Sequence, residues 1–231
     1  MALTIGLLGT ALVWVITRDE KRVCTHLLVE ITDYDQRQYL EADDVRRLLI
    51  REGLFVQGSP IDDVHCDAIE GRVASINVVR TAQCYKTAAG DVRIVLTQRE
   101  PLLRVITDHD VYFVDTDHKR LEDIESIRTP VIRISGSVRE TTARGPIAEM
   151  VEWLQHDTFW KDRINRIEIQ PNQHIILHQK GKSPALLLGE MNRYKSKLKR
   201  LQTFLAKVEP MGLPAYKELD ARYDGQVIGR R

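Results

Sequence analysis

The chain has 231 residues, 43% hydrophobic and 29% charged, so it can form packed cores and is not a disordered tail protein. Its 34 Lys and Arg nearly balance its 33 Asp and Glu, and this net charge of +1 argues against a nucleic-acid binder that works by phosphate neutralisation. An aromatic content of 6% argues against base-stacking platforms, and three cysteines without a C-x-x-C pair exclude the usual zinc and dithiol patterns.

The first element is an uncharged, mostly apolar stretch that predicts a transmembrane anchor over residues 1–17. As a helix this stretch spans about 24 Å, which is short for a hydrocarbon core of about 30 Å. A cleaved signal peptide and a soluble core helix are the two alternatives, although no basic residue precedes the stretch as a signal peptide requires. The anchor residues are Leu3, Ile5, Leu7, Leu8, Leu12, Val13, Trp14, Val15 and Ile16.

A linker is expected over residues 18–26, and its charges bear on the orientation of the anchor. Arg18, Lys21 and Arg22 follow the apolar stretch directly. By the positive-inside rule alone, these charges would place the large C-terminal part in the cytoplasm.

The segment 27–105 is expected to form a small α+β module. A strand is predicted at 27–31, then a helix that opens with acidic residues at 41–44 and carries an apolar stripe at Val45, Leu48 and Leu49. A second helix is expected to start at Asp62. Strands at 73–84 and 91–98 follow, joined by a turn over 88–91, so the predicted order is strand–helix–helix–strand–strand.

The segment 106–231 is expected to form a larger mixed α/β module with a mainly antiparallel sheet. Its last part, residues 216–228, reads either as a strand pair or as one extended strand. A helix is predicted after Gly145-Pro146, and a basic amphipathic helix carries Met191, Tyr194, Leu198, Leu201 and Leu205 on one side. The other expected strands are 105–106, 111–114, 131–134, 164–169, 174–178 and 185–188.

Motifs in the first module are LEADDVRRLL at 40–49, PIDDV at 60–64, ASINVVR at 74–80 and VRIVLTQREP at 92–101. They resemble a POTRA domain, a small module of bacterial envelope proteins. The second module continues with DVYFVDTDHKRL at 110–121, TPVIRISG at 129–136, LLLG at 186–189, KLKRL at 197–201 and LDARYDGQV at 219–227. In this order the motifs resemble the FtsQ/DivIB family of bacterial cell-division proteins.

The resemblance implies a non-enzymatic scaffold of the division complex without cofactor, small-molecule substrate or nucleic-acid partner. Its expected partners are FtsB- and FtsL-like coiled-coil proteins and further division proteins. Its implied location is the inner membrane at the division septum, with one membrane pass, a cytoplasmic N-terminus and both domains in the periplasm. The alternative is a POTRA-bearing envelope protein of another pathway, such as outer-membrane protein assembly or secretion.

The C-terminal segment is the candidate partner-binding site, because an edge strand can accept a partner strand through its free N–H and C=O groups. Alternation places Leu219, Ala221, Tyr223 and Val227 on one face of such a strand. The competing interpretation is an ordinary edge strand with Tyr223 packed on the core. With the resemblance, the expected binding residues are Leu219, Ala221, Arg222, Tyr223, Asp224, Gly225, Gln226 and Val227.

Other polar groups do not predict a catalytic or metal site. His174 and His178 lie in a predicted strand, where about 13 Å separates their Cα atoms, too far for one metal ion. The acidic residues between 108 and 118 lack the EF-hand spacing and are typical of solvated turns. Glu149, Glu152 and Asp157 show no sign of converging on a cleft.

The three cysteines all fall in the first module. Cys24 and Cys84 flank predicted strands, and in an oxidising periplasm these two are hypothesised to form a disulfide, leaving Cys66 over. The sequence does not fix whether their Cα atoms come within the roughly 7 Å that a disulfide requires.

Overall fold

A computed structural model describes residues 22–181, 184–211 and 216–231. The chain divides into two compact units, residues 1–98 and 99–231, which are described separately below. The predicted anchor at 1–17 lies outside the described residues. Within the described ranges, no helix has the length and apolar character needed to cross a membrane.

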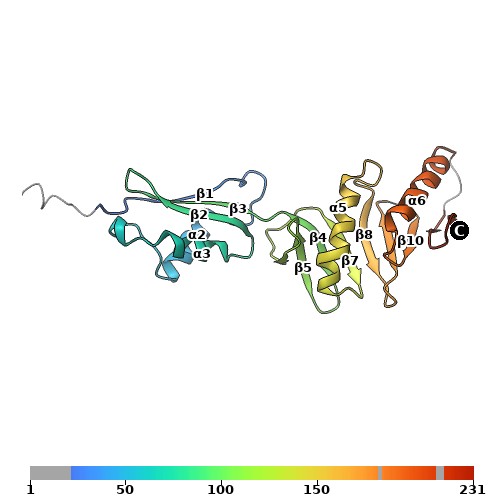
Figure 1. The fold of residues 1–231 in the computed structure, drawn as a ribbon, viewed down its shortest axis with the longest axis horizontal. Helices are drawn as coiled ribbons and strands as arrows, with labels where there is room; N and C mark the ends of the chain where they lie inside the picture. The colour runs from blue at the N-terminus through green and yellow to red at the C-terminus, as the bar shows by residue number, and fades with distance from the viewer. Residues whose placement is uncertain (1–21, 182–183, 212–215) are drawn as a thin grey trace, which may run out of the picture. The chain divides into compact units, whose positions relative to one another are not determined.

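The first unit has the predicted strand–helix–helix–strand–strand order (Figure 1). Its three strands pair in the order β1-β3-β2, with β1 parallel and β2 antiparallel to the central β3. The elements are β1 (Leu27–Ile31), α2 (Ala42–Arg51), a 3-10 turn η1 (Ile61–Asp63), α3 (Cys66–Ala74), β2 (Val79–Lys86) and β3 (Val92–Gln98).

Helix α2 begins where its sequence predicts. Glu41 and Asp44 form a reciprocal capping box that satisfies backbone N–H groups of the first turn. The stripe of Val45, Leu48 and Leu49 is buried, as expected from its helical spacing. Burial of this stripe holds the helix in the core of the first unit.

The second half of this unit differs from the prediction in its boundaries. The helix expected from Asp62 starts at Cys66, because residues 61–63 form only a 3-10 turn. The strand expected at 73–84 starts at Val79, because α3 runs on to Ala74 and buries Val73 on its inner side. A buried valine in this position fits a helix as well as a strand.

The unit boundary also differs from the predicted one at residue 105. The chain divides after Gln98, and the next strand, β4 (Pro101–Ile106), belongs to the sheet of the second unit. Leu103 and Val105 are buried in that second core. Gln98 stays with the first unit, where its side-chain oxygen accepts hydrogen bonds from the backbone N–H groups of Tyr39 and Leu40, each at 3.0 Å.

The described part of the second unit contains a nine-stranded sheet in the order β12-β11-β10-β9-β8-β7-β4-β5-β6. Five strand pairs are antiparallel and three are parallel, so the sheet is mainly antiparallel, as predicted. Besides β4, the strands are β5 (Val111–Asp115), β6 (Arg120–Glu122), β7 (Ile132–Gly136), β8 (Ile164–Ile169), β9 (Ile175–Gln179), β10 (Ala185–Gly189), β11 (Glu218–Asp220) and β12 (Ile228–Arg230).

Two helices, α5 (Ala148–His156) and α6 (Tyr194–Val208), pack on one face of this sheet and bury a shared core (Figure 1). The short α4 (Glu140–Thr142) and the segment η2 (Ala143–Ile147) precede α5. The chain kinks within η2 at Gly145, whose φ of −111° and ψ of −107° are not helical, so the main helix follows Gly145-Pro146 as predicted. A 3-10 turn, η3 (Glu209–Met211), follows α6. In the described part of the unit, no helix covers the opposite face, which we call the open face.

The cysteines are free thiols in this structure. Burial raises the pKa of the Cys84 thiol, and a hydrogen bond with Cys66 raises it further. Burial also raises the pKa of Cys24. The pairing of Cys24 with Cys84 stays a prediction, and Cys66 is the thiol that contacts Cys84.

Candidate interaction site at the C-terminal sheet edge

The C-terminal segment is a hairpin. Strand β11 ends at Asp220, and β12 starts at Ile228 and pairs antiparallel with it. Of the two sequence interpretations, the strand pair is therefore the correct one, and the single extended strand over 216–228 is wrong. The dipeptide Asp224-Gly225, with Gly225 at a φ of +76°, is a hairpin-turn signal from which the reversal was predictable.

The structure separates the predicted binding residues into two groups. Leu219 and Ala221 are fully buried and belong to the core. Tyr223 lies in the turn with 48% of its surface exposed, so the interpretation that packed it on the core is wrong. Val227 is half-buried, and the other exposed turn residues are Arg222, Asp224, Gly225 and Gln226.

Strand β12 is the outermost strand of the sheet and pairs only with β11. All three of its residues are exposed, and Ile228 has 39% of its surface accessible. An outermost strand presents backbone N–H and C=O groups along its free side, where another chain can pair. This free edge was not among the residues predicted from the sequence, which stopped at Val227.

A buried carboxylate fixes the hairpin. Asp220 has no exposed side-chain surface and accepts three hydrogen bonds from Arg222, at 3.1 Å from the backbone N–H, 2.9 Å from Nε and 2.6 Å from Nη2. Arg230 of β12 contacts the same carboxylate at 3.4 Å. The hydrogen bonds from Arg222 lower the pKa of Asp220, with a smaller contribution from the charge of Arg230. Asp220 therefore links the turn and both strands.

Helix α6 holds the turn from the other side. Arg200 donates hydrogen bonds from Nη2 to the backbone oxygens of Ala221, at 3.0 Å, and Tyr223, at 3.1 Å. Lys197 is buried beside it, and its Nζ donates to the backbone oxygen of Glu190 at 2.8 Å. Burial lowers the pKa of Lys197. The backbone of the turn is therefore held in place by a side chain of α6.

Two glycines allow close packing around the hairpin. A Cβ atom on Gly189 would lie 2.8 Å from Cγ of Arg222, whose side chain crosses this position. A Cβ atom on Gly229 would lie 2.4 Å from the ring of Tyr216. The glycine that ends the LLLG motif therefore leaves room for the arginine that binds Asp220.

A pocket of about 310 Å³ lies beside the turn and is rich in positive charge. Four basic side chains line it, against the carboxylates Glu190 and Asp224. Arg193 contacts Asp224 at 3.8 Å, but both side chains are largely exposed. The pocket therefore has the chemistry to accept an acidic side chain beside the turn that precedes β12. Its basic residues are Arg193, Lys197, Arg200 and Arg222.

His178, one of the two histidines considered as metal ligands, has structural contacts. His178 on β9 lies 3.0 Å from a carboxylate oxygen of Glu168 and 3.1 Å from Arg166. Over the residues that the structure describes, no group of three or more His, Cys, Asp and Glu side chains is arranged to hold a metal ion.

Comparison with known proteins matches each unit to a family model. A family model described as "FtsQ/DivIB, C-terminal related" matches residues 100–230, and a POTRA-like domain model matches residues 22–97. A search of curated proteins gives no match. One similar solved structure is the major extracytoplasmic domain of the trans isomer of the bacterial cell division protein DivIB from Geobacillus stearothermophilus. It shares 13% identity, covers 49% of this chain and 96% of its own, and has a TM-score of 0.33.

Proposed function

The chain belongs to the FtsQ/DivIB family of cell-division proteins, as its motifs predicted, and from this premise we propose that it is a non-enzymatic scaffold of the bacterial division complex. In this proposal, residues 1–17 anchor the chain in the inner membrane and both units lie in the periplasm at the septum. The scaffold works by holding a partner in a fixed register, which needs no catalytic group.

The partners in this proposal are FtsB- and FtsL-type proteins, one of which adds an extended segment to β12. The observation that supports this site is the exposed outer strand next to a turn that Asp220 and Arg200 hold in place. Main-chain hydrogen bonds to β12 provide affinity and register. Because the hairpin is already fixed before the partner binds, this chain loses little conformational entropy on binding.

Two side chains next to the edge give the site selectivity. Tyr223 and Ile228 are exposed apolar groups at the turn and the strand, and tyrosine is enriched among residues that dominate binding energy. The basic pocket beside them accepts a partner carboxylate, for which Arg222 and Arg193 are the exposed donors. We therefore expect a partner segment with an acidic residue next to its strand.

The test is a binding titration of the full chain with the extramembrane segments of FtsB and FtsL from the same cell. Wild type is compared with Tyr223→Ala and with Tyr85→Ala. Tyr85 is a matched control, because it is a tyrosine on an edge strand of the first unit with 43% of its surface exposed. We expect Tyr223→Ala to weaken binding about tenfold or more, as loss of an interface tyrosine usually does.

Tyr85→Ala is expected to bind as wild type does. No binding by folded wild type would contradict the scaffold proposal. Loss of binding in Tyr85→Ala alone would instead place the partner on the first unit and contradict the β12 site.

A further inference from the structure

The open face of the nine-stranded sheet carries basic side chains in register across four neighbouring strands. Arg104 on β4 is paired with Arg133 on β7, Arg133 with Arg166 on β8, and Arg166 with His178 on β9. Paired residues project to the same side of a sheet, so the four side chains share this face. We call Arg104, Arg133, Arg166 and His178 the arginine row.

Like charges opposite one another on neighbouring strands destabilise a sheet. The ends of the row are compensated, since Arg104 contacts Asp123 at 2.7 Å and Glu168 contacts His178 at 3.0 Å. Arg133, in the middle, is exposed and makes no contact with a carboxylate of any described residue. A central arginine between two others, without an acid of its own, leaves a positive site on the open face.

Two buried polar atoms near the row also have no hydrogen-bond partner among the described residues. One is Nε of Arg104, and the other is the hydroxyl of Ser135, two residues along β7 from Arg133. Buried polar groups are nearly always paired in folded proteins. A bound water or a polar ligand on this side of the sheet would satisfy them.

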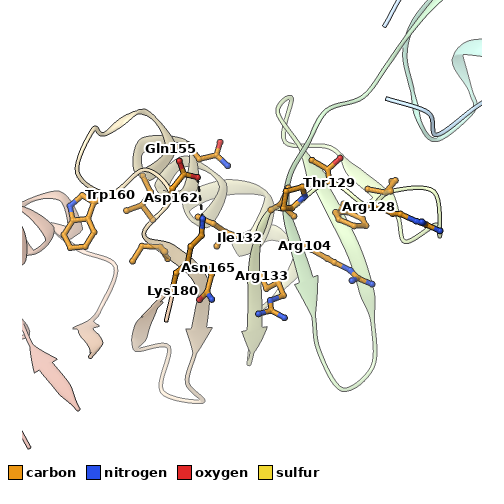
Figure 2. A pocket seen from close by; sticks show the side chains of 16 residues that line it. Arg104, Arg128, Thr129, Ile132, Arg133, Gln155, Trp160, Asp162, Asn165 and Lys180 are labelled. Carbon is orange, nitrogen blue, oxygen red and sulfur yellow. Dashed lines mark ion pairs between the residues drawn. The ribbon is translucent and has the colours of Figure 1, made fainter. Parts of the chain in front are cut away.

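Two residues of the row, Arg104 and Arg133, line a cavity of about 570 Å³, and Leu154 and Gln155 of α5 line it as well (Figure 2). Arg128 adds another exposed side chain without an acidic contact in the described structure, whereas Lys180 is paired with Asp162 at 3.6 Å. Much of the lining is apolar, which gives the cavity room for a large hydrophobic side chain. The apolar lining residues include Phe113, Pro130, Ile132, Leu154, Trp160 and Ile164.

We propose that the arginine row and this cavity bind an acidic peptide segment of a partner protein that carries one large apolar side chain. The carboxylates pair with Arg133 and Arg128, and the apolar side chain enters the cavity. The row spans about 14 Å across four strands, given a strand spacing of about 4.8 Å, which suits a short segment. This surface is separate from the β12 edge.

The acidic neighbours favour a peptide over a membrane or a nucleic acid. Asp123, Asp162 and Glu168 lie among the basic groups and would repel a ligand with negative charge along its whole length. A peptide with few carboxylates can contact Arg133 and Arg128 and avoid these acids. An apolar anchor also matches the cavity lining, which a phosphate backbone does not use.

The test uses the full chain and a fluorescein-labelled peptide in which glutamates flank a single tryptophan. Two control peptides replace the glutamates with glutamines or the tryptophan with alanine. The protein variants are Arg133→Glu, the milder Arg133→Gln, and Arg139→Glu, an exposed arginine outside the row with the same charge change. Fluorescence anisotropy measures each affinity at low and physiological salt.

We expect saturable binding by wild type that Arg133→Glu weakens at least tenfold, Arg133→Gln weakens less, and Arg139→Glu and Tyr223→Ala leave unchanged. Both control peptides are expected to bind more weakly. Absence of binding, or equal losses in Arg133→Glu and Arg139→Glu, would overturn the proposal. Binding to phosphatidylglycerol vesicles but not to the peptide, lost in Arg133→Glu, would also overturn it and assign the face to a membrane.

Discussion

The two edges of the nine-stranded sheet are built in opposite ways. At one end, β6 is capped by Arg120, which contacts Asp110 at 2.8 Å and Glu140 at 3.3 Å and lies 4.3 Å from the centre of the Tyr112 ring. At the other end, all three residues of β12 are exposed, and the neighbouring ion pairs around Asp220 point back toward β11 and the turn.

This difference shows that arginine–carboxylate contacts serve two purposes in one sheet. Around β6 they hold charged side chains on and beside the edge strand, and charge on an edge strand is a common way to prevent edge-to-edge pairing. Around β12 they fix the hairpin and leave its outer side free. The difference between the two edges follows from the position of the carboxylate. Asp110 pairs with a residue of the edge strand β6, which we call the closed edge, whereas the buried Asp220 lies on β11 and leaves β12, the open edge, exposed.

The largest effect is expected from removal of β12. A chain that ends at Val227 lacks residues 228–231, which include β12, and is predicted to bind the FtsB–FtsL segments about a hundredfold more weakly, because two or three main-chain hydrogen bonds contribute about 2–4 kcal/mol. The same titration as above measures this loss. Removal of Arg231 alone keeps β12 and is expected to leave binding unchanged; equal loss in both chains would contradict an edge contact.

The next largest effect is expected from loss of the Asp220 ion pairs that hold the β11–β12 hairpin. Asp220→Asn removes a buried charge from its two arginines and is predicted to lower the free energy of unfolding of the second unit by about 2 kcal/mol. Urea unfolding followed by circular dichroism measures this change. Asp224→Asn, at an exposed acid 3.8 Å from Arg193, is the control and is expected to change stability little.

The same carboxylate predicts a pH dependence. Because the folded-state pKa of Asp220 lies below its ordinary value of 3.8, its stabilisation is complete above that value and is lost as the pH falls through the lowered pKa. The stability gap between wild type and Asp220→Asn is therefore expected to close in acid. A stability gap that stays constant down to pH 2 would show that ionisation of Asp220 does not cause the stability difference.

A smaller effect is expected at the closed edge. Arg120→Ala removes the cap of β6, and we predict a loss of about 1 kcal/mol in the free energy of unfolding, because its acidic partners are partly exposed and solvent screens them. Binding of the FtsB–FtsL segments is expected to stay at the wild-type value. A matching drop in partner affinity would mean that the two edges do not act independently.

The smallest effect concerns the open face between the edges. Arg133→Thr removes the central charge of the arginine row and introduces a residue that favours strands. We expect the second unit to gain about 0.2–1 kcal/mol in stability. Thermal unfolding of this variant beside Arg139→Thr measures the gain. A loss of stability would show that Arg133 has a structural role.

Much of the fold was predictable because local patterns and packing agree. The stripe at Val45, Leu48 and Leu49 defines α2, and β1 occupies the predicted residues 27–31. Boundaries failed where one apolar residue fits two structures. Val73 is buried in a helix and not in a strand, and Leu103 belongs to the second core although its segment continues directly from the first unit.

The sequence predicted the location of the candidate site in the C-terminal segment, but not its hairpin structure. Alternation in 219–227 separates Asp220 from the apolar face of Leu219 and Ala221, but it does not predict that Asp220 is buried against Arg222 and Arg230. A carboxylate is buried only with such partners, and Arg230 lies ten residues further along the chain. The arginine row was equally hidden, because its register depends on pairing between strands that are distant in sequence.

The most direct test of the open edge is hydrogen exchange of the full chain, by mass spectrometry, with and without the FtsB–FtsL segments. Peptides covering β12, at 228–230, and β6, at 120–122, are compared in one experiment. Strand addition predicts slower exchange at β12 and unchanged exchange at β6, because newly paired amides are protected. Unchanged exchange at β12 in the bound complex would contradict the account.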